Sequence, residues 1–354
     1  MSRPYRAAIL GATGAVGQKF VRLLAAHPWF SVSAVVASER SAGKTYAEAT
    51  RWLEACHMPD EVASLRVASL ADSVDADVVF SALDAPLARE YEPRFAAHTA
   101  VVSNASAFRS HPAVPLVVPE VNADHLSLLE RQTFGAGCLV TVPNCSSVGL
   151  AAALGPLDRA FGLTCVHVTT LQAVSGAGYP GVPSLDILGN VIPFIPGEED
   201  KIEREPLEIL GRLGTEGVEP LRARISAQVH RVPVVDGHVL AVSAGFRTRA
   251  DPRAVLDAWR GFESGLPDGL PSAPPRFLEV FDRDEWPQPR LHAGLGGGMT
   301  VSLGRARACR VLDVRFSVLV HNTVRGAAGN AVLIAELLAR TGRLRVPRLA
   351  TTTV

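Results

Sequence analysis

The chain has 354 residues, of which 47% are hydrophobic and 20% charged, and its formal net charge is zero. This length allows two domains of ordinary size, and the balanced composition excludes a disordered chain and a surface for nucleic acid. Five cysteines, an odd number without C-x-x-C spacing, argue against a disulfide framework and a zinc site, so we expect a reducing compartment and no metal.

The N-terminus leads directly into a strand-like run over residues 5–10, without the apolar segment of a signal peptide. No apolar stretch of the sequence approaches the ~20 residues that are needed to span a membrane. We therefore expect a cytoplasmic protein that has no membrane partner.

A glycine turn and a helical run over 18–26 follow this first strand, which is the order of a dinucleotide site. Glycines permit a tight turn and let the backbone approach a pyrophosphate, which then lies at the helix N-terminus. The spacing is G-x-x-G-x-x-G instead of the commoner G-x-G-x-x-G, so a glycine turn without a ligand remains an alternative. The cofactor residues predicted in this turn are Gly11, Thr13, Gly14, Ala15 and Val16.

The segment after the next strand, which we predict over 31–37, indicates which dinucleotide binds. An NAD site usually has an acidic residue here that holds the ribose hydroxyls. Ser38, Arg40 and Ser41 suit a 2′-phosphate instead and favour NADP. Glu39 keeps NAD possible, and a solvated polar loop is the alternative without a ligand.

Alternation of strands and helices continues through strands predicted over 77–83 and 100–104, so residues 1–142 are predicted to form one doubly wound α/β domain. Beyond this point the pattern changes to a mainly antiparallel sheet flanked by helices, which predicts a second domain of α+β type over 143–322. A last helix over 326–344 is expected to return to the first domain, so that about 323–345 completes it. The strands predicted in the second domain cover residues 165–173, 224–229, 238–246 and 311–320.

Cys145 lies where a strand-like run ends and an apolar helical run begins, which places it at a helix N-terminus. Unpaired N–H groups and the helix dipole favour a thiolate there, and the same N–H groups could stabilise an oxyanion. The pattern therefore predicts an activated thiol. A small buried structural cysteine is the alternative.

A nucleophilic thiol beside a nicotinamide cofactor describes an aldehyde dehydrogenase that works through a thioacyl intermediate. Such an enzyme needs an acid or base near the sulfur and a cation for an anionic substrate. Arg231 and His238 supply these groups if a turn at Asp236-Gly237 brings them together, although His238 alone could be a structural histidine. A cysteine hydrolase would leave the glycine turn unexplained, and a catalytically silent binding protein would leave the reactive residues unexplained.

Motifs along nearly the whole chain resemble, in the same order, those of the aspartate-semialdehyde dehydrogenases, specifically the branch found in archaea, fungi and some bacteria. These motifs are residues 11–17 (GATGAVG), 41–44 (SAGK), 143–146 (PNCS), 172–181 (QAVSGAGYPG), 190–194 (NVIPF), 197–201 (GEEDK), 231–233 (RVP), 236–238 (DGH) and 321–329 (HNTVRGAAG).

This resemblance implies a Rossmann-like NADP-binding domain and a catalytic and dimerisation domain. It also implies NADP-dependent reductive dephosphorylation of L-aspartyl-4-phosphate to L-aspartate 4-semialdehyde, in the synthesis of lysine, methionine and threonine. Inorganic phosphate is then the co-substrate of the reverse reaction. The enzyme is expected to be a homodimer or homotetramer.

The resemblance also implies roles for individual residues. The catalytic residues are the nucleophile Cys145, the acid/base His238, Gln172, which positions the acyl intermediate, and Asn144, which polarises its oxygen. The substrate-binding residues are Arg231 for the α-carboxylate, Glu198 for the α-ammonium, and Arg109 and Lys201 for the phosphate. Further cofactor-binding residues are Ser175, Gly176, Asn322 and Arg325.

Three departures from the family pattern leave the acyl substrate open. Val229-His230 stands where the family commonly has Cys-Asn, Val239-Leu240-Ala241 where Thr-Glu often follows the histidine, and Ser110-His111 where an aromatic or Met-like residue is usual. A reductase of malonyl-CoA or of another acyl-CoA or acyl phosphate is therefore the alternative. Glu198, Lys201 and Arg231 favour an amino-acid substrate, and the resemblance to N-acetyl-γ-glutamyl-phosphate reductases is mainly one of fold.

Overall fold

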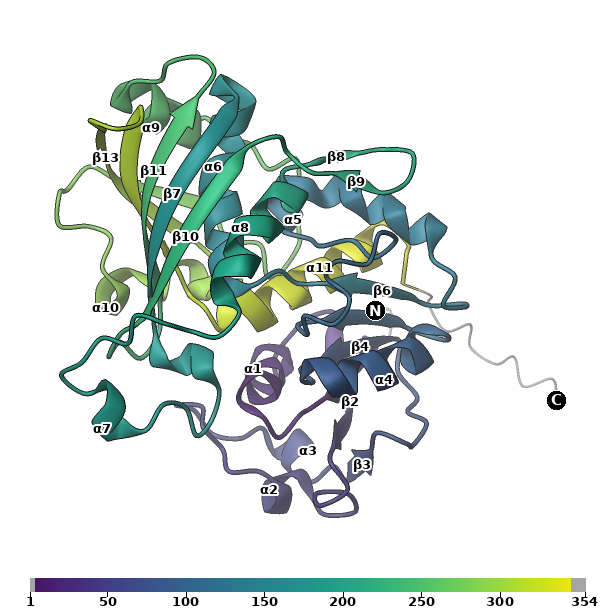
Figure 1. Cartoon of the computed structure of the whole chain (residues 1–354). Coiled ribbons are helices and arrows are strands. Elements are labelled where there is room, and N and C mark those ends of the chain that lie inside the picture. The colour runs from purple at the N-terminus through teal and green to yellow at the C-terminus, as the bar shows by residue number, and fades with distance from the viewer. Residues whose placement is uncertain (1–3, 345–354) are drawn as a thin grey trace.

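Two six-stranded sheets lie in separate halves of the computed structural model, which describes residues 4–344 (Figure 1). The first sheet is parallel throughout and has the strand order β3-β2-β1-β4-β5-β6. This is the doubly wound order, in which the direction of winding reverses between β1 and β4 and leaves a ligand crevice at their carboxyl ends. Its strands are β1 (Tyr5–Leu10), β2 (Phe30–Ala37), β3 (Val67–Ser69), β4 (Val78–Ser81), β5 (Ala100–Ser103) and β6 (Cys138–Thr141).

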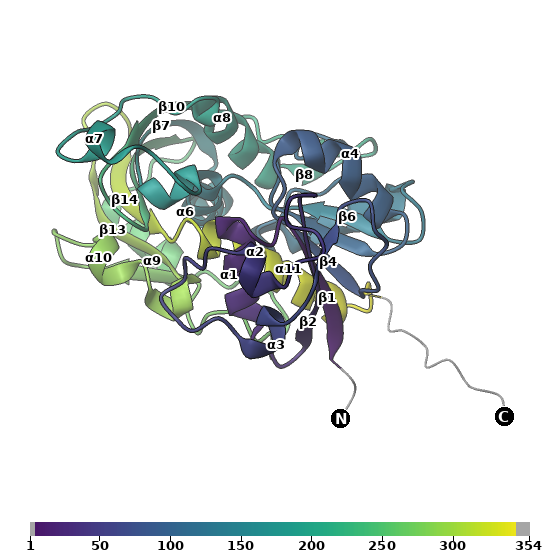
Figure 2. The same ribbon diagram turned by 90° about the horizontal axis from the view of Figure 1, so that it is seen from below.

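Helices cover both faces of this sheet because successive residues of each strand point to opposite sides. Ile9 of β1 packs with Phe20 of α1 (Ala15–Leu24) and with Leu333 of α11 (Gly329–Arg340) in one core. Figure 2 shows the purple helix α1 beside the yellow helix α11. On the opposite face, Leu10 belongs to the core under α4 (Ala85–Ala96).

The C-terminal helix differs from the one predicted over 326–344. It begins as the π-helical turn η4 (Val324–Ala328) and continues as α11, which ends at Arg340. Gly342, with φ 71°, has the left-handed conformation that ends a helix, and a glycine adopts it without the steric cost of a Cβ. The domain limits at residues 142 and 322 stay a prediction.

The second sheet has the order β10-β7-β11-β14-β13-β12. Its three central pairings are antiparallel and its two outer pairings are parallel, so the predicted mainly antiparallel sheet is confirmed, with parallel strands at both edges. Its strands are β7 (Leu163–Gln172), β10 (Arg224–Arg231), β11 (His238–Phe246), β12 (Leu278–Phe281), β13 (Val301–Ala308) and β14 (Val314–Val320).

The run that we predicted as one strand over 311–320 is shorter in the structure, because Val311 lies in the turn between β13 and β14 and is 87% exposed. Two helices, α6 (Cys145–Phe161) and α9 (Pro252–Arg260), cover the buried face of this sheet. Trp259 of α9 joins them, since its indole N–H donates to the Ala153 carbonyl at 2.8 Å.

The helix α8 (Glu198–Ile209) packs against β10 and α6 (Figure 1). No helix within residues 4–344 is both long enough and apolar enough to cross a membrane. The remaining short elements are α2 (Tyr46–Ala49), α3 (Asp60–Ala63), α5 (Pro119–Asn122), η1 (Ala123–Arg131), η2 (Val174–Ala177), α7 (Ser184–Ile187), β8 (Arg212–Leu213), β9 (Val218–Glu219), α10 (Pro289–His292) and η3 (Leu295–Gly298).

Candidate active site

Cys145 is the first residue of α6, which starts just beyond the carboxyl end of β6 and runs to the second sheet. Asn144 caps this helix, because its Oδ1 accepts hydrogen bonds from the N–H groups of Ser146 at 2.9 Å and Ser147 at 3.4 Å. The cap therefore occupies two of the N–H groups that we expected to be free for an oxyanion. Among the described residues, the N–H of Cys145 itself has no hydrogen-bond acceptor.

The Cys145 thiol differs from the expected thiolate. Burial raises its pKa from 9.0 to about 12, and the Glu198 carboxylate contributes to this rise. Arg109, the Ser146 N–H and Arg231 act in the opposite direction but do not overcome it. The expectation based on the helix N-terminus alone is therefore wrong for the pKa, and a group that takes the thiol proton is needed.

His238 begins β11 and is fully buried. Burial, followed by the charges of Arg231 and His321, lowers its pKa from 6.5 to about 3, so the imidazole is neutral at neutral pH. Its Nδ1 accepts a hydrogen bond from the Ala173 N–H at 3.0 Å, which places the hydrogen of the neutral ring on Nε2. Nε2 is buried and has no partner among the described residues, so it is available to a ligand.

Arg231 and His238 lie together, as the turn at Asp236-Gly237 predicted. A Cβ built on Gly176 would be 2.9 Å from Nη1 of Arg231 and 3.2 Å from Nε2 of His238, so both side chains border the same glycine. Arg231 is 6% exposed and donates from Nη1 to the Ala173 carbonyl at 2.7 Å. Any side chain at position 176 would enter the space next to both groups.

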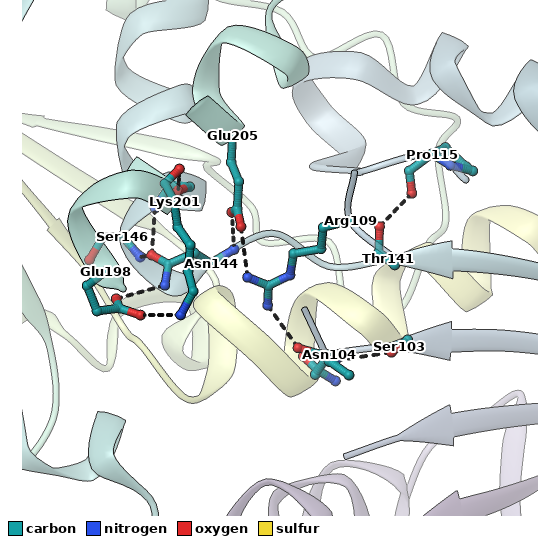
Figure 3. A network of polar contacts seen from close by, with 12 residues as sticks. Ser103, Asn104, Arg109, Pro115, Thr141, Asn144, Ser146, Glu198, Lys201 and Glu205 are labelled. Carbon is teal, nitrogen blue, oxygen red and sulfur yellow. Dashed lines mark hydrogen bonds and ion pairs between the residues drawn. The ribbon is translucent and has the colours of Figure 1, made fainter. Parts of the chain in front are cut away.

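Glu198, the first residue of α8, joins three of the predicted site residues, of which Figure 3 labels Lys201 and Asn144. Its Oε1 accepts from Lys201 Nζ at 2.9 Å, and its Oε2 accepts from Asn144 Nδ2 at 2.8 Å and from Gln172 Nε2 at 3.4 Å. Burial opposes the charge, but Lys201, Asn144 and Gln172 together lower the pKa of Glu198. A carboxylate in this position is anionic at neutral pH and suits an ammonium group.

Arg109 reaches the same region from the loop after β5 (Figure 3). It is 8% exposed, and its Nη1 donates to Glu205 Oε1 at 2.9 Å while Nη2 donates to the Asn104 carbonyl at 2.8 Å. Glu205 was not predicted from the sequence. The signal was present, however, because positions 198, 201 and 205 follow the i, i+3, i+7 spacing of one helix face.

The glycine turn between β1 and α1 fits a dinucleotide. Gly11 has φ 71°, and a Cβ there would be 2.7 Å from the Ala82 carbonyl oxygen beyond β4. A Cβ on Gly17 would be 2.3 Å from the Gly11 carbonyl oxygen, so only glycine lets α1 approach the strand this closely. Within residues 4–344 no side chain caps α1 at Gly14, and its first turn has no acidic residue, which leaves this helix start suited to a pyrophosphate.

The segment after β2 offers exposed hydroxyls and a cation. Ser38 and Arg40 are exposed and Ser41 is half-buried. Glu39, the residue that kept NAD possible, is bound by the Ser69 hydroxyl through its carboxylate. Arg40 is thus an exposed cation of this segment and the candidate for a 2′-phosphate.

Asn322 and Ser175 lie together next to His238. Asn322 accepts from the Gly237 N–H at 2.9 Å and donates to Ser175 Oγ at 2.8 Å. The amide thus connects the turn before His238 to the loop after β7. Their contact with a cofactor stays a prediction.

The structure corrects the prediction for Arg325. Its side chain is fully buried, Nη1 and Nη2 donate to the two carboxylate oxygens of Glu120, and the guanidinium lies 4.9 Å from the ring centroid of Phe277. A guanidinium held in this way in the interior cannot contact a cofactor. The assignment of its side chain to cofactor binding was therefore wrong.

Family models match both halves of the chain. The model described as "Semialdehyde dehydrogenase, NAD binding domain" matches residues 6–129, and "Semialdehyde dehydrogenase, dimerisation domain" matches residues 154–325. A protein named aspartate-semialdehyde dehydrogenase from Archaeoglobus fulgidus is 47% identical over 339 residues, which are 94% of this chain and 98% of that protein. The protein of the same name from Schizosaccharomyces pombe is 44% identical over 348 residues, with 94% and 98% covered.

Solved structures agree with these matches. The crystal structure of aspartate-semialdehyde dehydrogenase with NADP from Candida albicans superposes with a TM-score of 0.90 at 40% identity and covers 96% of this chain and 99% of that chain. Aspartate-semialdehyde dehydrogenase II from Vibrio cholerae gives a TM-score of 0.76 at 29% identity over the same shares.

Proposed function

The chain belongs to the aspartate-semialdehyde dehydrogenase family, and from this premise we propose that it interconverts L-aspartyl-4-phosphate and L-aspartate 4-semialdehyde with NADP through a thioacyl intermediate on Cys145. The observation that carries the proposal is that the charges of Glu198 and Arg231 act on the Cys145 thiol, while Arg231 and the neutral imidazole of His238 border the same glycine, Gly176. The reaction belongs to the synthesis of lysine, methionine and threonine.

In the oxidative direction the Cys145 sulfur forms a bond to the aldehyde carbon, the carbonyl π bond breaks, and the thiol proton passes by way of His238 to the carbonyl oxygen. Loss of a hydride from that carbon and of the hydroxyl proton then gives the thioester. In this proposal two donors stabilise the developing oxyanion: the Nε2–H of His238 and the second hydrogen of the Asn144 amide nitrogen. Accepting the thiol proton at Nε2 requires the other tautomer of His238, which loses the hydrogen bond from Ala173. Nicotinamide, when bound, takes or supplies the hydride.

The second half of the reaction transfers the acyl group from sulfur to phosphate. A phosphate oxygen forms a bond to the thioester carbon, the carbon–sulfur bond breaks, and the electron pair stays on Cys145. Arg109 and Lys201 hold the phosphate in this proposal. Gln172 at the end of β7 is 1% exposed and positions the acyl intermediate.

The substrate's amino-acid end is recognised by two opposite charges. Arg231 binds the α-carboxylate and Glu198 the α-ammonium, since the lowered pKa of Glu198 keeps it anionic. NADP is held by the turn at Gly11, Thr13, Gly14, Ala15 and Val16, by Ser38, Arg40 and Ser41, and by Ser175, Gly176 and Asn322. The chain carries a dimerisation domain of the family, and we infer a homodimer or homotetramer.

A CoA thioester reductase remains the second candidate because of the departures at Val229-His230, Val239-Leu240-Ala241 and Ser110-His111. Such an enzyme would use Cys145 but would not need Glu198 for an ammonium group. The names of the relatives favour the amino-acid substrate.

One assay separates the two candidates. Purified protein is mixed with NADP, phosphate and aspartate semialdehyde, and NADPH formation is followed by absorbance, beside NADPH oxidation with malonyl-CoA. Phosphate-dependent turnover of the semialdehyde is expected. Activity with the CoA thioester alone would favour the second candidate and leave Glu198 and Lys201 without the proposed roles.

A further inference from the structure

Glu205 is a buried carboxylate that lies between two parts of the site. It stands on α8, seven residues after Glu198, and is 1% exposed. Its two oxygens serve different donors: Oε1 accepts from Nη1 of Arg109 at 2.9 Å, and Oε2 accepts from the backbone N–H of Asn144 at 2.5 Å. One side chain therefore connects a cationic side chain to the residue that precedes Cys145 (Figure 3).

The contact with Arg109 fixes the guanidinium from one side. Burying a carboxylate is unfavourable unless a cation and hydrogen-bond donors compensate it, and Arg109 supplies both. The Asn104 carbonyl holds the other terminal nitrogen at 2.8 Å, so the plane of the guanidinium is defined. Its Nε is buried without a partner among the described residues and is thus a donor for a ligand.

The contact with Asn144 fixes the start of α6. The Asn144 side chain caps the helix through Ser146, and its backbone N–H is held by Glu205. Without this acceptor the Asn144 side chain still caps α6 through Ser146 and Ser147, whereas Arg109 loses one of the two acceptors that hold its guanidinium. Glu205 and the Asn104 carbonyl together set the position of the Arg109 guanidinium.

We propose that Glu205 is a positioning residue that holds Arg109 in the place where a bound phosphate can reach the acyl group on Cys145. This inference rests on the proposed function. The step that depends on it is phosphorolysis: a phosphate oxygen bonds to the thioester carbon, the carbon–sulfur bond breaks, and the sulfur keeps the electron pair. Formation of the thioacyl group and hydride transfer do not involve phosphate.

Glu205→Gln tests this role because glutamine keeps the shape but has one acceptor oxygen and one donor nitrogen. That nitrogen must face either the Asn144 N–H or the Arg109 guanidinium, and each contact sets donor against donor. We expect the KM for phosphate to rise about tenfold or more. Without phosphate, the single-turnover burst of NADPH should keep its rate within about twofold.

Glu203→Gln is the matched control. Glu203 stands on the same helix and accepts the Ala227 N–H at 2.9 Å, so this variant perturbs a comparable hydrogen bond outside the site. Its phosphate KM should equal that of the wild type. Thermal unfolding of both variants separates a loss of stability from a loss of positioning.

Two further variants keep the test decisive. A double-mutant cycle compares the effect of Glu205→Gln in the wild type with its effect in Arg109→Ala. In the Arg109→Ala background Glu205→Gln should raise the phosphate KM much less than it does in the wild type, because both substitutions act on one group. If Glu205→Gln does not fold, Glu205→Asp replaces it. Its shorter carboxylate keeps the charge but cannot bridge both donors, and the phosphate KM should again rise while the burst persists.

The wild-type assay tests the proposed function separately. If wild type shows no turnover, protection of Cys145 from iodoacetamide by inorganic phosphate still reports the site at Arg109, and Glu205→Gln should weaken that protection where Glu203→Gln does not. Equal phosphate KM and equal protection in the two variants would overturn the inference. A burst that slows as much as steady-state turnover would do so too, because Glu205 would then act on the thiol step.

Discussion

Gly326 lies against Cys145 so closely that a Cβ built on it would be 2.5 Å from the Cβ and 2.9 Å from the Cα of Cys145. The π-helical turn η4 therefore packs directly on the start of α6, and on its other side it contacts α1. The thiol and the proposed cofactor helix are thus connected through a segment that tolerates no side chain at position 326.

Gly326→Ala is expected to displace Cys145 and lower kcat/KM by about tenfold or more, with a loss of stability of about 1–3 kcal/mol from overpacking. Gly294→Ala is the control, since among the described residues nothing beyond its chain neighbours lies within 4 Å of the added Cβ, and its φ is −82°. Steady-state kinetics and thermal unfolding measure both effects. Full activity in Gly326→Ala would show that the backbone at Cys145 has room to move.

Reactivity of the free thiol should increase when Glu198 loses its charge. The Glu198 carboxylate is one cause of the raised pKa of Cys145, so Glu198→Gln lowers that pKa and increases the thiolate fraction at pH 8. We expect iodoacetamide to alkylate Cys145 faster in this variant than in the wild type. Mass spectrometry of the Cys145 peptide measures the rate. Glu199→Gln removes a carboxylate charge from the same helix but keeps an oxygen that can accept the Val229 N–H, and it should leave the rate unchanged. A slower reaction in Glu198→Gln would contradict the electrostatic account.

Arg40→Ala should weaken NADP binding by about tenfold or more and leave NAD binding nearly unchanged, because only NADP carries a 2′-phosphate. Binding titrations with both dinucleotides measure the difference. Arg253→Ala, which removes an exposed cation from α9, serves as the control for net charge. Equal losses for NADP and NAD would exclude the 2′-phosphate contact.

Stability should depend on pH through Glu208. Burial, and then the charge of Glu205, raises the pKa of Glu208 from 4.5 to about 7, so the folded state favours the protonated acid. The contribution of Glu208 to the free energy of unfolding is fully present below pH about 4.5 and is lost as the pH rises through about 7. Glu208→Gln should therefore be more stable than wild type above pH 7, by on the order of 2 kcal/mol. Denaturant unfolding at pH 5 and pH 8 measures the stability difference between Glu208→Gln and the wild type. An equal difference at both pH values would contradict the raised pKa of Glu208.

The sequence was sufficient for the fold class because its signals are local. The glycine spacing and the strand-like run over residues 5–10 that precedes it predict the doubly wound domain, and the structure has β1 in this place at the centre of the first sheet. The strand β13 was missed because its second half, Gly304-Arg305-Ala306-Arg307-Ala308, alternates arginines with small residues and lacks the β-branched pattern of a buried strand.

The electrostatics of the site could not be predicted in the same way. The pKa of Cys145 depends on burial and on Glu198, which is separated from it by 53 positions and comes close only when α8 packs on α6. Arg325 was assigned from its motif, whereas its partner Glu120 is 205 positions away. The spacing of positions 198, 201 and 205 was enough to predict that Glu205 shares a helix face with Glu198 and Lys201. Its contact with Arg109 depends on how two segments 96 positions apart are arranged in the fold.

We expect Cys145 to carry the acyl intermediate. Wild-type protein incubated with NADP and aspartate semialdehyde without phosphate, then measured by intact-protein and peptide mass spectrometry, should show one aspartyl thioester per chain on Cys145, and phosphate should remove it. Cys145→Ser should show no thioester and no NADPH burst while it binds NADP normally. NADPH formation without an adduct on Cys145, or a burst that persists in Cys145→Ser, would contradict the account.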